Sequence, residues 1–81
     1  MSKKENLIEE FKRAKTFDYR KFVTMMNGLG YEKVENAGSR VIFFNKDTGH
    51  MLHMHSPHPE KDLQRGAVNG IRKTLIENGV I

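Results

Sequence analysis

Residues 40–55 read RVIFFNKDTGHMLHMH, and this stretch decides the fold. Arg40 to Asn45 (RVIFFN) is rich in β-branched and aromatic residues, the strongest strand pattern in the chain. Lys46 to Gly49 (KDTG) has the residue types of a tight loop between two strands. His50 to His55 then reads as the returning strand. The stretch therefore predicts an antiparallel β-hairpin.

The chain on either side of the hairpin supplies a third strand and the boundaries of the sheet. Tyr31 to Glu35 is predicted as a short strand, and residues 36–39 (NAGS) as the turn that joins it to the hairpin. Pro57 and Pro59 end the returning strand, because proline lacks the backbone N–H and restrains the residue before it. We therefore expect a three-stranded antiparallel meander.

Three other segments show the apolar spacing of helices. The first covers about residues 3–15, the second begins at the N-cap Asp18 and ends at Gly30, and the last closes near Asn78-Gly79. The order α-α-β-β-β-α predicts an α+β fold in one domain over residues 1–81. Its two layers are a three-stranded antiparallel sheet and helices on one face of it.

Side-chain alternation along the hairpin strands decides which residues share a face of the sheet. We expect Val41, Phe43, Leu52 and Met54 to pack against the helices. The opposite face then carries a mixed set of side chains: Arg40, Ile42, Phe44, Met51, His53 and His55. Large apolar residues on an open face are unexpected in a free monomer, so we expect a protein partner, a second copy or the first helix to cover them.

Size and composition restrict the function. The chain has 81 residues, enough for one small core, and no cysteine, so it has neither disulfides nor thiolate metal sites. No apolar run approaches the ~20 residues that cross a bilayer, and the opening MSKKENLIEE lacks the apolar region of a signal peptide. We therefore expect a cytoplasmic protein. Its net charge of +4 favours a polyanionic partner, nucleic acid above all.

All four histidines of the chain fall within nine residues, next to a basic segment. Imidazole is the side chain that titrates nearest neutrality, so this cluster suggests proton transfer, metal ligation or phosphate contact. If the polyanionic partner is RNA and the chain cleaves it without metal, the reaction needs a base, an acid and a cation beside the phosphate. We expect His55 and His58 as acid and base, with His53 as a further candidate, and Arg40 or Lys61 as the cation.

Other polar residues are expected to bind such an RNA or to support the fold. The Ser39 hydroxyl is expected to position a phosphate, and Lys46 and Arg65 to contact further phosphates. His50 is interpreted as a cap of the hairpin, and Arg72 as part of a solvated helix face.

The pattern His53-x-His55-x-x-His58 also fits three imidazole ligands of a zinc ion with an open fourth position. Pro57 and Pro59, however, restrict the return that this site needs, and no neighbouring carboxylate is an obvious partner for the ligands. We therefore expect no metal and no cofactor.

Several short motifs, taken in order, make the chain resemble the HicA toxins, the small RNA-cleaving partners of HicAB toxin–antitoxin systems. They are a helix that ends in Leu29-Gly30-Tyr31, a Gly38-Ser39 turn into a strand, a hairpin, and residues 61–66 (KDLQRG) opening a helix. The resemblance covers residues 17–80 and leaves the additional first helix, residues 1–15, outside it. It implies a fold similar to a double-stranded-RNA-binding domain, α-β-β-β-α, which agrees with the element order above.

The resemblance also implies a messenger-RNA endonuclease (an mRNA interferase) that a HicB-like antitoxin holds inactive. The residues that match the family are Gly38, Ser39, His58 and Gly66. The family's G-S-H triplet, however, ends in Arg40 here, and an arginine stays protonated and cannot take a proton. Either the acid/base role has moved to other histidines, or this member is a non-catalytic RNA-binding module.

The outward-facing Ile42 and Phe44 are the expected contacts of the antitoxin. Because they would lie beside Arg40 and the strand histidines, an inhibitor that covers them also hides the site. We therefore predict that antitoxin and RNA binding are mutually exclusive, with Phe44 as the shared anchor.

Overall fold

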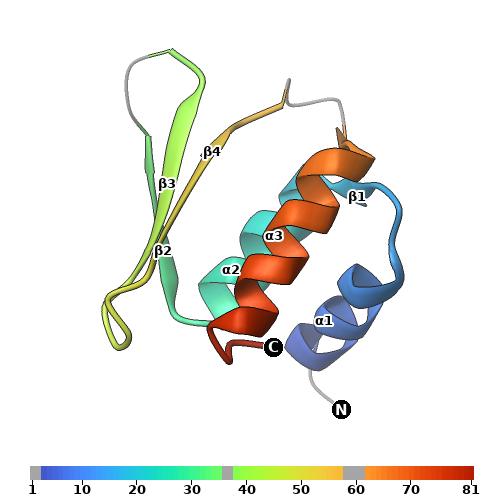
Figure 1. Cartoon of the computed structure of the whole chain (residues 1–81), viewed down its shortest axis with the longest axis horizontal. Coiled ribbons are helices and arrows are strands. Elements are labelled where there is room, and N and C mark those ends of the chain that lie inside the picture. The colour runs from blue at the N-terminus through green and yellow to red at the C-terminus, as the bar shows by residue number, and fades with distance from the viewer. Residues whose placement is uncertain (1–2, 36–37, 58–61) are drawn as a thin grey trace.

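Three antiparallel strands form the main sheet: β2 (Tyr31–Glu35), β3 (Arg40–Asn45) and β4 (Met51–His55), in the order β2-β3-β4. The computed structural model, which describes residues 3–35, 38–57 and 62–81, shows this sheet as one layer of an α+β fold (Figure 1). The predicted fold class, the meander and the central hairpin are confirmed.

The register of the hairpin sets the two faces of the sheet. Val41 pairs with Met54 and Phe43 with Leu52, and these side chains face the helices, with Phe43 fully buried. The alternate residues project from the other side, which we call the open face. The faces predicted from alternation are therefore confirmed.

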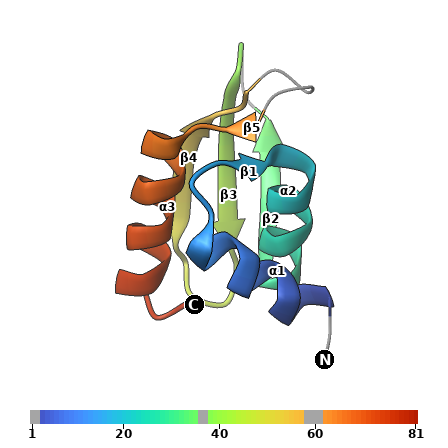
Figure 2. The same ribbon diagram turned by 90° about the vertical axis from the view of Figure 1, so that its right-hand side faces the viewer.

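Helices α2 (Tyr19–Gly28) and α3 (Arg65–Glu77) cover the buried face of the sheet (Figure 2). The N-cap predicted for α2 is confirmed, because the Lys21 backbone N–H donates to Asp18 Oδ1 over 2.9 Å. The predicted end of α3 is also confirmed: Asn78 is its C-cap, and Gly79 follows in the left-handed region with φ of 71°.

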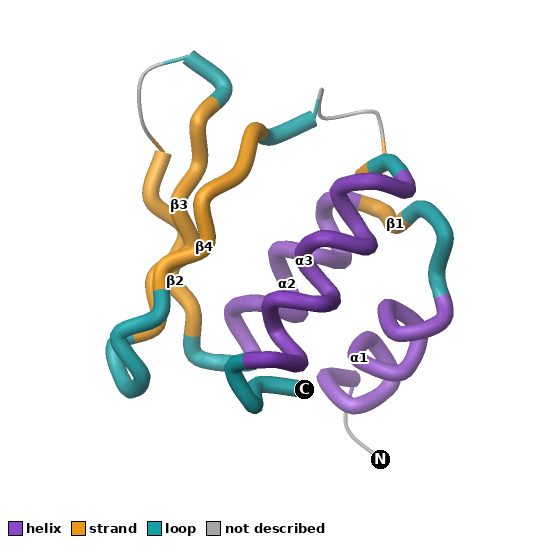
Figure 3. The backbone as a smooth tube through the Cα atoms, in the orientation of Figure 1, coloured by secondary structure: helices purple, strands orange, loops and turns teal. Residues whose placement is uncertain are grey.

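Helix α1 (Lys3–Arg13) lies on the side of α2 and α3 that faces away from the sheet (Figures 1 and 3). Its Phe11 is fully buried, with ring centroids 5.1 Å from Phe17 and 5.8 Å from Phe22. Burial of this ring fixes where α1 docks. The first helix therefore does not cover the open face, and that expectation is wrong.

Arg72 of α3 holds the end of α1 in place. Its guanidinium donates to the carbonyl oxygens of Phe11, Lys12 and Ala14 over 3.2, 2.9 and 3.1 Å. The last carbonyls of a helix have no partner within that helix, so a charged donor satisfies them well. The interpretation of Arg72 as part of a solvated face is therefore wrong, since the side chain joins two helices.

A second, two-stranded sheet pairs β1 (Phe17–Asp18) with β5 (Asp62–Leu63) in antiparallel fashion. The sequence does not predict this pair, because two residues are too few to show an alternation. It also moves the start of the last helix, which begins at Arg65 rather than within the segment that contains Asp62 and Leu63. The buried Phe17 and Leu63 join this pair to the core.

Asn45, buried at the end of β3, closes the hairpin loop. Its Oδ1 accepts from the backbone N–H groups of Asp47 and Thr48, and its Nδ2 donates to the Leu29 carbonyl over 3.2 Å. One amide side chain thus satisfies the loop and ties it to the end of α2. Within the described residues, no helix has the length and apolar character to cross a membrane.

Candidate active site

Arg40 and His55 are direct cross-strand partners at one end of the sheet. Strand register places Arg40 of β3 opposite His55 of β4, and Ile42 opposite His53. Arg40, His53 and His55 are all exposed and share the open face. The structure therefore brings together three of the residues that the sequence predicted for catalysis and RNA binding.

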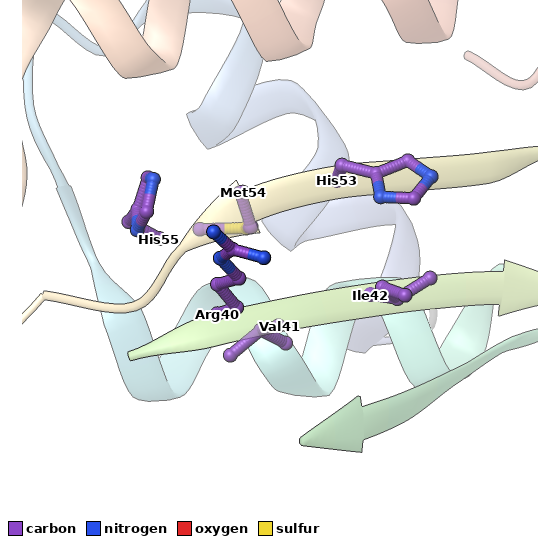
Figure 4. Close-up of a pocket in the computed structure, with 6 residues that line it drawn as sticks. All are labelled: Arg40, Val41, Ile42, His53, Met54 and His55. Atoms are coloured by element: carbon purple, nitrogen blue, oxygen red, sulfur yellow. The ribbon is translucent and has the colours of Figure 1, made fainter. Parts of the chain in front are cut away.

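These side chains line a shallow hollow of about 480 Å³ between the ends of β3 and β4. Figure 4 shows Arg40 and Ile42 on one side of β3 and Val41 on the other, with the imidazoles of His53 and His55 on the neighbouring strand. Among the residues that the structure describes, the walls of the hollow are Arg40, Val41, Ile42, His53, Met54 and His55, and none of these is acidic. Its charge therefore suits an anion.

Ser39 adds a hydroxyl to the same end of the sheet. Its Oγ lies 3.5 Å from His55 Nδ1, at the outer limit of a hydrogen bond. The backbone fixes this approach more firmly, because the Ser56 N–H donates to the Ser39 carbonyl over 2.7 Å. Hydroxyl, imidazole and guanidinium thus converge where β3 begins and β4 ends.

A strip of apolar side chains continues along the open face from this hollow. Ile42 lies between Val34 and His53 in the register, and Phe44 lies between Glu32 and Met51. The strip consists of Val34, Ile42, Phe44 and Met51, of which Val34 and Met51 are 46% and 49% exposed. The sequence predicted Ile42, Phe44 and Met51 on this face but not Val34, although strand alternation along β2 would have placed it there.

His50 has a structural environment that differs from those of His53 and His55. Its Nδ1 is hydrogen-bonded to the Tyr31 hydroxyl over 2.7 Å, and its ring meets the Tyr31 ring edge-on at 5.7 Å. It is partly buried at the start of the returning strand. Its interpretation as a support of the hairpin agrees with these contacts.

Lys46 and Arg65, which the sequence also predicted as RNA contacts, are not among the residues that line the hollow. Lys46 follows the far end of β3 and forms an ion pair with Glu32, with Nζ 2.9 Å from Oε1. The hydrogen bond to Glu32 and the negative charge of that carboxylate raise the pKa of Lys46. The raised pKa favours the charged ammonium, and the neighbouring carboxylate offsets part of its charge. Arg65 is the exposed first residue of α3.

The predicted residues His58 and Lys61 lie outside the described residues. The structure therefore places His55 and His53 but not the other half of the predicted acid/base pair. Across the described ranges, no group of three or more His, Asp or Glu side chains is arranged to hold a metal ion.

The geometry defines a small α+β domain with a cationic, histidine-bearing sheet end beside an apolar strip. The family described as "HicA toxin of bacterial toxin-antitoxin" matches residues 19–76, well over half of the chain. No curated protein and no solved structure matches it. The chain belongs to the HicA toxin family, and it is a toxin of the toxin–antitoxin type.

Proposed function

We propose that this toxin is a cytoplasmic endoribonuclease that cleaves messenger RNA by metal-independent acid/base chemistry. Three properties support the proposal: membership of the family, a net charge of +4, and imidazoles beside a guanidinium on an open face. We also propose that a HicB-like antitoxin neutralises it.

The single observation that carries the proposal is the pairing of His55 with Arg40. The family's histidine position is occupied by Arg40, and the side chain directly opposite it on the next strand is an imidazole. Opposed residues in an antiparallel pair have Cβ atoms only about 5 Å apart. A histidine at position 55 can therefore reach the phosphate that a histidine at position 40 would serve.

Each group has a distinct role in the proposed reaction. One imidazole takes the proton of the ribose 2′-hydroxyl, and the 2′-oxygen then attacks phosphorus. A second imidazole protonates the 5′-oxygen as its bond to phosphorus breaks. Arg40 holds the phosphate and stabilises the charge that builds on its oxygens. His55 is one of the two imidazoles. His53, about 6.6 Å along the same strand face, and His58 are the candidates for the other.

Ser39 and the remaining cations are assigned to binding. The Ser39 hydroxyl, close to His55, positions the phosphate, while Lys46, Lys61 and Arg65 contact the backbone further along the RNA. Contacts of this kind do not select sequence, so binding should weaken steeply as salt rises.

The apolar strip is the proposed contact of the antitoxin. Ile42 and Phe44 lie at its centre, and Ile42 is also a wall of the hollow beside Arg40 and His55. A protein that covers the strip also blocks access to His53 and His55. Antitoxin and RNA would then compete for the same face.

The function is tested by inducing the toxin in cells and by incubating purified protein with messenger RNA in EDTA. The proposal predicts growth arrest on induction and cleavage of the RNA. Both should be lost when the second acid/base histidine is replaced, so one of the variants His53→Ala and His58→Ala should be inactive. Protein that binds RNA but never cleaves it, with or without added divalent metal, would contradict the enzymatic assignment.

The replacement of the family histidine by Arg40 favours a second candidate, a non-catalytic RNA-binding module of the same fold. In that case RNA binding survives substitution of every histidine and still weakens with salt. The Arg40→His variant distinguishes the two: cleavage gained from an inert parent supports the module, whereas robust cleavage by the wild-type protein excludes it.

A further inference from the structure

A second hollow lies on the helix-facing side of the sheet, at the same end as Arg40 and His55, and the proposed reaction does not use it. It has a volume of about 390 Å³ and is framed by α2, the last residues of β2 and the segment after β4. Its walls are Tyr19, Arg20, Val23, Lys33, Glu35, Ser56 and Pro57.

One wall of this hollow is an aromatic ring held in place from behind. Tyr19 is partly buried, and its ring stacks on that of Phe22 with centroids 6.4 Å apart and planes 24° from parallel. Val23 and Pro57 supply further apolar surface. A partly exposed aromatic ring in an apolar slot suits a planar ligand, and unpaired RNA bases bind proteins in this way.

The rim of the hollow carries a hydrogen-bond donor beside a pair of acceptors. Lys33 and Glu35 are two residues apart on the same face of β2, and Lys33 Nζ lies 3.1 Å from Glu35 Oε1. The same ammonium group lies over the Tyr19 ring, 6.0 Å from its centre. A base that stacks on this ring takes the place of the flexible ammonium group, which then lies with the Glu35 carboxylate at the edge of the base.

We propose that this hollow binds one unpaired guanine of the RNA substrate, stacked on Tyr19. Guanine presents an acceptor, O6, next to two donors, N1–H and the exocyclic N2 amino group. Lys33 donates to O6, and the two carboxylate oxygens of Glu35 accept from the two donors. The other bases fit less well, because adenine and cytosine place donors and acceptors in the reverse order and uracil turns a second acceptor toward Glu35.

The charge of the hollow allows an RNA strand to approach. Glu35 is the one acidic side chain in the described wall, and Lys33 is paired with it. Arg20 adds a further positive charge to the same wall. The carboxylate therefore acts as a local acceptor in a net cationic site.

The hollow is adjacent to the candidate active site through the backbone. Ser56 directly follows His55, so its Cα is about 3.8 Å from that of His55. On the neighbouring strand, Glu35 pairs with Val41, the residue after Arg40. An RNA strand that passes over this end of the sheet can place a phosphate at Arg40 and His55 and its neighbouring base in the hollow. The inference rests on the proposed function and adds a base preference to it.

The test measures binding of short single-stranded oligonucleotides that carry a 2′-deoxy sugar at each position and therefore resist cleavage. A deoxyuridine background contains one guanine, one adenine or one abasic position, and fluorescence anisotropy gives Kd at fixed salt. The guanine oligonucleotide should bind about tenfold more tightly than the other two, within the range reported for one stacked and hydrogen-bonded base.

Variants connect this preference to the hollow. Glu35→Gln, a substitution at an exposed residue, should abolish the guanine preference, and so should Tyr19→Ala. Tyr19→Phe should keep most of it. Glu32→Gln is the matched control, because Glu32 is also an ion-paired residue of β2 but projects from the open face. It should leave the preference unchanged, and circular dichroism confirms that each variant is folded.

The outcomes separate the inference from the function on which it rests. Equal Kd values for the three oligonucleotides, with messenger RNA still cleaved, overturn the guanine site and leave the endoribonuclease intact. A guanine preference that survives both Glu35→Gln and Tyr19→Ala places recognition elsewhere and also overturns it. If no oligonucleotide binds and no RNA is cleaved, both proposals fail.

Discussion

Phe43 and Phe44 are neighbours in β3, yet their side chains lie in opposite environments. Phe43 is fully buried, with its ring edge-on to Phe22 of α2 at 5.3 Å. Phe44 projects from the open face between Glu32 and Met51 and is partly buried there. The difference decides which of the two residues serves folding and which is available to a partner.

Truncation of each ring should therefore affect the free energy of unfolding very differently. Phe43→Ala leaves a cavity in the core and should cost about 3–5 kcal/mol, whereas Phe44→Ala should cost less than about 1.5 kcal/mol. Urea unfolding followed by circular dichroism measures both. Equal losses would contradict the assignment of the two faces.

The Phe44→Ala variant also tests the antitoxin contact. Phe44→Ala should weaken binding of a HicB-like antitoxin by about 1–3 kcal/mol, the usual range for an interface hot spot. Titration calorimetry with the folded variant gives the affinity, and Val34→Ala provides a weaker second probe of the strip. An unchanged affinity for the Phe44 variant would remove this residue from the interface.

Arg72 should contribute to stability out of proportion to its position on a helix surface. Arg72→Met removes three hydrogen bonds to the end of α1 and should lower the free energy of unfolding by about 1.5–3 kcal/mol, the range for bonds to a charged group. Arg72→Lys should rescue only part of the loss, because one ammonium on a shorter side chain cannot donate both to these carbonyls and to Asn69 Oδ1, as the two guanidinium nitrogens do.

Lys73 is the matched control for this prediction, since it is the next residue of α3 and is exposed. Lys73→Met should leave the free energy of unfolding nearly unchanged. If the Arg72 and Lys73 variants unfold at the same urea concentration as the wild type, the contact between α1 and α3 is not a source of stability.

Tyr31 should make the fold sensitive to alkaline pH. Burial raises the pKa of the Tyr31 phenol above its ordinary value of 10.0, so the folded state favours the neutral phenol. The stability that this provides is complete below pH 10 and is lost as pH rises through the raised value. The wild type should therefore lose more stability than Tyr31→Phe between pH 9 and pH 11, roughly the span of the titration.

At neutral pH the wild type should be more stable than Tyr31→Phe, because the substitution removes the hydrogen bond to His50. That loss should cost about 1 kcal/mol. Urea unfolding at a series of pH values measures both effects. Parallel stability curves for the two proteins across the alkaline range would contradict a raised pKa at this position.

Alternation made most of the sheet predictable. In β4 the apolar Leu52 and Met54 alternate with His53 and His55, so the period of two assigned the faces of that strand. The faces of β3, which has four apolar residues in a row, followed from its pairing with β4. The cap at Asp18 and the end of the last helix were predictable because each depends on the residue types at that point of the chain. Such signals lie within a few residues of the feature that they specify.

The features that escaped prediction depend on contacts between distant residues. The β1–β5 pair joins Phe17 to Leu63, and Arg72 reaches carbonyls about sixty positions earlier in the chain. The hollow around Tyr19 is assembled from α2, β2 and the segment after β4, which no local pattern connects. Of the candidate active site, alternation placed His53 and His55 together, and register added that Arg40 lies directly opposite His55.

The most direct test of the account is the rate at which the His55→Gln variant cleaves messenger RNA in EDTA. His50→Gln serves as the matched histidine control, and circular dichroism verifies that both variants are folded. Loss of an acid/base group should slow single-turnover cleavage by about 100-fold or more for His55→Gln, with little change for His50→Gln. Cleavage at the wild-type rate by folded His55→Gln protein would contradict the proposal that the imidazole opposite Arg40 has taken over the family histidine's role.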